Sequence, residues 1–203
     1  MKEIAKDVFV SEILSDTNIK KHRKRVANHI KKMLDKCEIK KGKVLEIGAH
    51  KSPCIQPFPQ SNFEYCIMGI NENIQHNIPA MYGDITNCPH VQDNSYDVIL
   101  SIDVFEHIMN PWKAASEIYR ILKPKGMVYT LTVFSWRYHK SPNDYWRFTP
   151  DALELIFSDF KTIEKGFDHS GRRKKIKKPT VPKDKKGSYW SENWRVFYVG
   201  TKE

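Results

Sequence analysis

The sequence predicts an α/β fold, built on a doubly wound and mostly parallel β-sheet of seven strands. Three observations carry this prediction. The chain has 203 residues, enough for one α/β domain with a substantial core. Short apolar runs recur along it, as in strands that are covered on both faces. These runs alternate with segments of helical periodicity, which indicates strand–helix–strand units.

The first expected element is an amphipathic helix over residues 16–36, and Asp16 or Thr17 can cap its start. Lysines and arginines cover most of its surface, and one apolar stripe predicts the face that contacts the core. The stripe consists of Val26, Ile30, Met33 and Leu34. We therefore divide the chain into an N-terminal helical extension, residues 1–41, and a domain over residues 42–203.

Six strands of the expected sheet can be located individually from their apolar runs. We place them at residues 43–48, 65–70, 96–101, 127–133, 160–167 and 194–201. A helix over residues 111–123 begins near Pro111 and is stopped by the segment 123–126. Thr149 caps a second helix, which runs to about Phe157.

The charge of the chain is strongly basic, with a formal net charge of +10. Part of the excess lies at residues 172–186, where lysine, proline and glycine without apolar spacing predict an exposed loop. A basic balance suggests an anionic partner such as nucleic acid.

Cysteine spacing and hydropathy argue against several classes of protein: zinc-binding, disulfide-rich, membrane-spanning and secreted proteins. The four cysteines form no CxxC pair, so neither a zinc knuckle nor a disulfide framework is indicated. No apolar run is long enough to span a bilayer, and the N-terminus lacks the apolar core of a signal peptide. We expect a cytoplasmic protein without membrane insertion, and the sequence does not give its oligomeric state.

The first chemical signal is an acidic residue and a glycine, Glu46 and Gly48, at the end of the first strand. A glycine at a strand-to-helix turn lets the backbone approach a ligand closely. Here the sequence resembles class I methyltransferases, which have a Rossmann-like fold. The resemblance implies that Glu46, Gly48 and Ala49 support the amino-acid part of S-adenosylmethionine (SAM). The second and third glycines of the family motif are replaced by His50 and Ser52.

Further residues match the cofactor site of that family. Asn71 follows the second strand, where the family carries an acidic residue for the ribose hydroxyls. The resemblance implies that Asp84 meets the adenine amino group and that Ile85 lies beside the ring. Ser101 is the small polar residue that ends the strand at 96–101.

The most specific stretch runs from Asp93 through an acidic-His pair, Glu106-His107, to the Leu-Lys-Pro turn before Gly126. It resembles the methyltransferase branch often called type 11, and the resemblance covers roughly residues 42–165. It implies SAM as the cofactor and S-adenosylhomocysteine as the product.

Two histidines are candidates for a general base. Methyl transfer to oxygen needs an aligned nucleophile and a group that removes its proton, and histidine suits this at neutral pH. His107 follows the strand at 96–101, and His139 follows the strand at 127–133. Asp144, close to His139 in the sequence, is the third candidate catalytic residue. His107 has two alternative roles: it can cap the next helix or hold the methionine part of the cofactor.

The loop after the strand at 127–133 is rich in aromatic and charged residues, as a carbohydrate site requires. The candidate substrate-binding residues are Asp103, Tyr145, Trp146 and Arg147. Alternatives remain: Asp103 can face the cofactor, Asp144 and Arg147 can form a structural pair, and Trp146 can belong to the core. Asp103 and Asp144 could contribute to a metal site, but without a clear constellation of ligands we expect no metal.

The segment 139–150 resembles one in small methyltransferases of glycan biosynthesis, including those of large algal viruses. We therefore expect O-methylation of a sugar hydroxyl, for example on a deoxysugar such as rhamnose in a glycan or a nucleotide-sugar. The alternatives are a methyltransferase that acts on nucleic acid or another anionic partner, and a SAM-fold binding protein without activity.

Overall fold

The computed structural model describes residues 17–48, 53–70, 78–136, 138–140, 142–168 and 195–203. Several features of the sequence interpretation lie outside the described residues: Asp16, Ala49, His50, Ser52, Asn71 and the basic segment 172–186.

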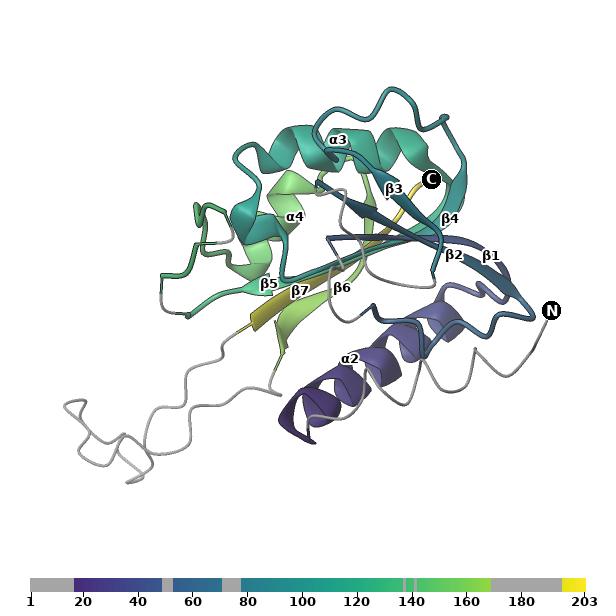
Figure 1. Ribbon diagram of the computed structural model, residues 1–203, viewed down its shortest axis with the longest axis horizontal. Helices are drawn as coiled ribbons and strands as arrows, with labels where there is room; N and C mark the ends of the chain where they lie inside the picture. The colour runs from purple at the N-terminus through teal and green to yellow at the C-terminus, as the bar shows by residue number, and fades with distance from the viewer. Residues whose placement is uncertain (1–16, 49–52, 71–77, 137, 141, 169–194) are drawn as a thin grey trace.

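A seven-stranded sheet forms the centre of the molecule, in the order β3-β2-β1-β4-β5-β7-β6 (Figure 1). Its strands are β1 (Gly42–Ile47), β2 (Phe63–Gly69), β3 (Ala80–Tyr82), β4 (Tyr96–Ile102), β5 (Leu122–Val133), β6 (Lys161–Asp168) and β7 (Arg195–Thr201). All neighbours pair in parallel except β7, which is antiparallel to both β5 and β6. The predicted seven-stranded, mostly parallel sheet is confirmed.

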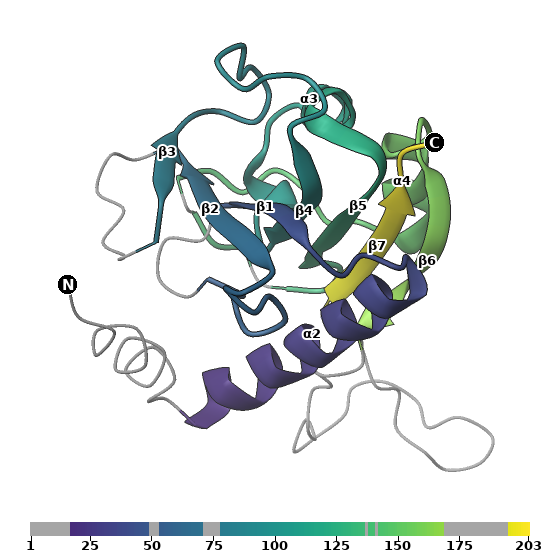
Figure 2. The same cartoon turned by 90° about the vertical axis from the view of Figure 1, so that its right-hand side faces the viewer.

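Helices cover both faces of this sheet (Figure 2). One face carries α2 (Thr17–Lys36), and the other carries α3 (Pro111–Ile121), α4 (Pro150–Ile156) and the short 3-10 helix η1 (Phe105–His107). The predicted apolar stripe of α2 is at most 5% exposed, and it packs with Val98 and Leu100 of β4. The division into an extension and a domain remains a prediction.

One predicted boundary is wrong. The helix expected over residues 111–123 ends at Ile121, and β5 begins with the next residue. Leu122 pairs with Tyr96 in the sheet, so residues 123–126 belong to the strand, with a register shift in β4 between Tyr96 and Val98. Pairing in the sheet therefore places residues 122 and 123, which were expected to end the helix, in the strand.

The helix caps follow the sequence signals. Thr149 Oγ1 accepts a hydrogen bond from the Ala152 N–H at 3.1 Å, as predicted, and Asn110 caps α3 by accepting from the Lys113 N–H. All four cysteines are free thiols, in line with their spacing. Among the described helices, none combines the length and apolar character needed to cross a membrane.

Candidate active site

The site is built at the carboxyl edge of the central strands. In the register of the sheet, Ile47 of β1 lies beside Ser101 of β4, and Ser101 lies beside Thr130 of β5. Because these strands are parallel, the segments that follow them leave the sheet at the same edge, where α/β folds bind ligands.

Gly48 marks the end of β1 and adopts a left-handed backbone, with φ of +77°. A Cβ atom there would lie 2.6 Å from Val104 Cγ2, so the position has no room for a side chain. The Gly48 N–H donates to the Met68 carbonyl at 2.7 Å. The glycine thus lets the chain turn out of the sheet directly beside the segment that leads to η1.

Glu46 is buried in β1 and bonds within the protein. Its Oε2 accepts a hydrogen bond from the Cys54 N–H at 2.7 Å and another from the Tyr65 hydroxyl. Burial raises the pKa of this carboxyl to about 7, and the two hydrogen bonds only partly oppose that shift. Glu46 therefore ties the segment after β1 to β2.

The remaining described cofactor candidates differ in exposure. Asp84 is exposed, and its Oδ1 accepts hydrogen bonds from the N–H and hydroxyl of Thr86 at 2.8 and 2.9 Å. Ile85 is only 4% exposed and packs in the core. The Ser101 hydroxyl is fully buried and has no hydrogen-bond partner among the described residues. The exposed carboxylate of Asp84 is compatible with the contact to the adenine amino group that the family resemblance implies. The left-handed backbone of Gly48 is likewise compatible with a close approach of the amino-acid part of SAM.

Glu106, His107 and His139 form a compact cluster at this edge, which we call the Glu-His-His cluster. Glu106 Oε1 lies 3.8 Å from His107 Nε2 and 4.0 Å from His139 Nε2, and the two imidazole rings are 4.9 Å apart, edge to face. Glu106 is fully buried, and burial raises the pKa of its carboxyl, with the Asp103 charge adding to the effect. The two predicted bases are therefore brought together.

Asp144 holds His139 from the other side. Its Oδ2 accepts from the His139 N–H at 2.7 Å and lies 3.3 Å from His139 Nδ1. Arg147 binds both carboxylate oxygens, at 2.6 and 2.8 Å, and holds the pKa of Asp144 well below its usual range. Asp144 and Arg147 thus form an ion pair, and Asp144 also contacts a candidate base, His139; the role of Arg147 in substrate binding stays a prediction.

His107 is held by the loop that contains Asn143 and Asp144. Its Nδ1 contacts the Asn143 carbonyl oxygen, which can only accept a hydrogen bond, so Nδ1 carries the proton and Nε2 faces Glu106. The cap of α3 is Asn110, which excludes the helix-capping role considered for His107.

The substrate candidates have distinct surroundings. Asp103 forms a two-pronged ion pair with Arg195 of β7. The Trp146 indole N–H donates to the Ile108 carbonyl at 2.9 Å, and its ring packs against the core. Tyr145 is 46% exposed, and its backbone N–H donates to the Glu106 carbonyl, so its side chain remains accessible beside the cluster.

The sequence interpretation missed two residues of the site, Glu106 and Arg195. The Glu106-His107 pair was visible as a motif, but nothing in the sequence showed that the carboxylate turns inward. Arg195 pairs with a residue 92 positions away, and local patterns do not report such a contact.

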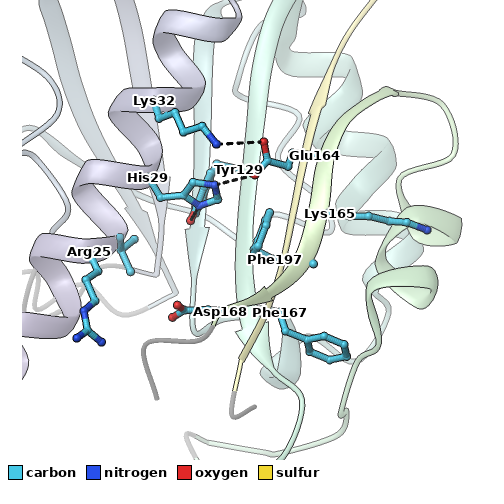
Figure 3. A pocket seen from close by; sticks show the side chains of 11 residues that line it. Arg25, His29, Lys32, Tyr129, Glu164, Lys165, Phe167, Asp168 and Phe197 are labelled. Atoms are coloured by element: carbon cyan, nitrogen blue, oxygen red, sulfur yellow. Dashed lines mark hydrogen bonds and ion pairs between the residues drawn. The ribbon is translucent and has the colours of Figure 1, made fainter. Parts of the chain in front are cut away.

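A separate hollow of about 680 Å³ lies between α2 and β6 (Figure 3). His29 and Lys32 of α2 lie 3.4 and 3.7 Å from Glu164 of β6. Tyr129 of β5 lines the hollow, whereas Thr132, which contacts Glu106, projects from the opposite face of that strand. The hollow and the Glu-His-His cluster are therefore on different sides of the sheet.

Comparisons with known proteins agree with this architecture. Ubiquinone biosynthesis O-methyltransferase of Dictyostelium discoideum is 27% identical over 93 residues, which are 45% of this chain and 28% of the relative. Thiol S-methyltransferase TMT1B of Rattus norvegicus is 28% identical over 131 residues, 57% of this chain and 50% of the relative. The chain thus spans half or less of the length of these two curated relatives.

A solved structure, the PH0226 protein of Pyrococcus horikoshii OT3, shares the fold. It superposes with a TM-score of 0.58 at 16% identity, covering 90% of this chain and 91% of that one. The family model described as a methyltransferase domain matches residues 19–171. Because this match covers well over half of the sequence, the chain belongs to the methyltransferase-domain family, and its family and fold imply SAM as the methyl donor.

Proposed function

We propose that the protein transfers a methyl group from SAM to a hydroxyl oxygen of a sugar. The observation that carries this proposal is the pair of imidazoles, His107 and His139, 4.9 Å apart at the carboxyl edge where the cofactor is expected. An alcohol is a weak acid, and a positioned base that takes its proton accelerates transfer by about 10²- to 10⁴-fold. The expected cytoplasmic location is part of this proposal.

The cluster favours oxygen over sulfur as the acceptor atom. One of the two curated relatives methylates thiols and the other is an O-methyltransferase, as their names state. A thiol ionises with a pKa of about 8.5 and needs little help at neutral pH. A hydroxyl acceptor, in contrast, needs a base to remove its proton, and the two histidines beside a buried carboxylate can provide one.

A sugar acceptor is supported by the aromatic side chains around the edge. Trp112, Trp136, Tyr138 and Tyr145 are each between 38% and 67% exposed, so their rings are accessible to a ligand. Aromatic faces stack on the apolar faces of sugar rings, and nearby charged groups bind the hydroxyls. A phenolic hydroxyl is the second candidate, favoured by the similarity to the ubiquinone O-methyltransferase.

The proposal is tested in two steps. Calorimetry with SAM first shows whether the cofactor binds. Absence of binding would support the alternative of a protein that keeps the methyltransferase fold but has no activity. The protein is then incubated with SAM and panels of unmethylated oligosaccharides, nucleotide-sugars, phenols, thiols and nucleic acids. A mass gain of one methyl group on a sugar is expected. Methylation confined to another panel, or no product on any sugar, contradicts the proposal.

A further inference from the structure

We propose that the Glu-His-His cluster binds a divalent transition-metal ion, with Glu106 Oε1, His107 Nε2 and His139 Nε2 as ligands. This differs from the metal-free site expected from the sequence. One ligand atom from each of the three residues lies within 4.8 Å of the others, and Oε1 is 3.8 and 4.0 Å from Nε2 of His107 and His139. Ligands at about 2.0–2.2 Å from one ion lie about 3.0–3.5 Å apart. The two Oε1–Nε2 separations therefore need a contraction of about 1 Å or less, and the widest pair of ligand atoms needs less than about 2 Å.

An unpartnered buried oxygen independently points to a ligand. Glu106 is fully buried, and Thr132 Oγ1 donates to its Oε2 at 2.6 Å. Its Oε1 has no hydrogen-bond partner among the described residues. A buried carboxylate oxygen without a donor is costly, and both histidine nitrogens are too distant for a hydrogen bond to it. A cation bound between the three groups would provide the partner that Glu106 Oε1 lacks.

Groups behind the histidines orient both rings for metal binding. The Asn143 carbonyl holds Nδ1 of His107, and the Asp144 carboxylate holds the backbone N–H and lies beside Nδ1 of His139. Each contact favours the tautomer with the proton on Nδ1, so that Nε2, which lies 3.8 and 4.0 Å from Glu106 Oε1 in the two rings, is the unprotonated nitrogen. Metal-binding histidines are typically held in this way by a carboxylate or carbonyl on the other nitrogen.

The donor set selects the kind of ion. Two imidazoles and one carboxylate suit Zn²⁺, Mn²⁺, Co²⁺ or Fe²⁺, whereas Mg²⁺ and Ca²⁺ prefer oxygen donors alone. Three protein ligands leave at least one coordination position open, as in catalytic sites. If the proposed function holds, that position takes the acceptor hydroxyl and lowers its pKa, and its proton passes to solvent water as the oxygen bonds to the methyl group of SAM and the bond from that methyl to sulfur breaks. The histidines then promote the transfer as metal ligands, in place of the direct proton acceptance proposed for the metal-free site.

Binding is tested on the full chain after removal of metal with EDTA. Titration with Zn²⁺, Mn²⁺ and Co²⁺ is followed by calorimetry and, for Co²⁺, by visible absorption. We expect one ion per chain for at least one metal, and binding at least about 10-fold weaker in Glu106→Gln, His107→Ala and His139→Ala. His90→Ala, which removes an exposed histidine outside the cluster, should bind like the unaltered protein.

Three outcomes overturn the site: no binding of any of the three ions, binding retained in all three variants, or binding lost equally in His90→Ala. Circular dichroism and a SAM titration show that each variant is folded. Should Glu106→Gln not fold, the two histidine variants decide. The readout is metal binding, so it can succeed even where no sugar is methylated. If the metal-free protein instead methylates its acceptor at the full rate, the ion does not activate the hydroxyl.

Discussion

Arg195, the first residue of β7, holds Asp103 through two hydrogen bonds, from Nε to Oδ1 at 2.7 Å and from Nη2 to Oδ2 at 2.9 Å. Asp103 follows β4 with φ of +55°, in the left-handed region. The pair therefore fixes the turn that leads into η1, and η1 carries two residues of the Glu-His-His cluster.

Asp103→Asn should lower the free energy of unfolding by about 1 kcal/mol, measured by urea denaturation. The side chain keeps its shape and asparagine tolerates the left-handed backbone, so the variant removes mainly the charge. The effect is modest because the carboxylate is 35% exposed. Asp159→Asn, at an exposed turn, should leave stability unchanged, and equal losses in both variants would argue against a specific role of the ion pair.

Glu46 should make stability depend on pH. Its pKa rises from an ordinary value of about 4.3 when unfolded to about 7 when folded. The Glu46 carboxyl thus binds its proton more tightly in the folded state than in the unfolded state. The stability that the protonated carboxyl contributes is fully present below about pH 4.3 and is lost as the pH rises towards 7.

Glu46→Gln keeps a neutral group at this position at every pH. Its stability relative to the unaltered protein should therefore increase between about pH 5 and about pH 8, measured by urea unfolding across that range. Tyr65→Phe removes one hydrogen bond to the carboxylate and should strengthen the pH dependence, because that bond lowers the pKa. A stability difference that stays constant with pH would show that Glu46 does not titrate in this range.

Most of the fold could be predicted from the sequence because apolar runs report burial directly. The strands β1, β2, β4, β6 and β7 and the helix α2 lie within two residues of their expected bounds. β3 was not located because its three apolar residues make too short a run to indicate a strand, and two of them are exposed. β5 was extended by pairing between Leu122 and Tyr96, a tertiary contact.

The site was less predictable because its geometry depends on contacts across the chain. His107 and His139 were identified from chemistry and position, but their meeting depends on the path of the loop that contains Asp144. Glu106 was recognised from the sequence only as part of the acidic-His motif, and only the fold shows that it is buried and bonded to Thr132.

His107→Ala and His139→Ala should each lower kcat for methyl transfer by about 10²- to 10⁴-fold, whether the imidazoles act as bases or as metal ligands. The dissociation constant for SAM, measured by calorimetry, should not change, because neither histidine is among the residues proposed above to bind the cofactor. His90→Ala serves as the control with an exposed histidine. Full activity in either cluster variant would remove that histidine from the chemistry.

Asp144→Asn tests the support behind His139. The fully buried carboxylate holds the His139 N–H at 2.7 Å and Arg147 at 2.6 and 2.8 Å, and asparagine fills the same volume without the charge. Asp144 is a positioning residue, so we expect a loss of about 10- to 100-fold in kcat, a similar loss in metal affinity, and an unchanged KM for SAM. The control is Asp151→Asn on α4, where an exposed carboxylate pairs with Lys165 of β6. If Asp144→Asn lowered thermal stability without changing kcat or metal affinity, Asp144 would serve only the loop and not the histidine.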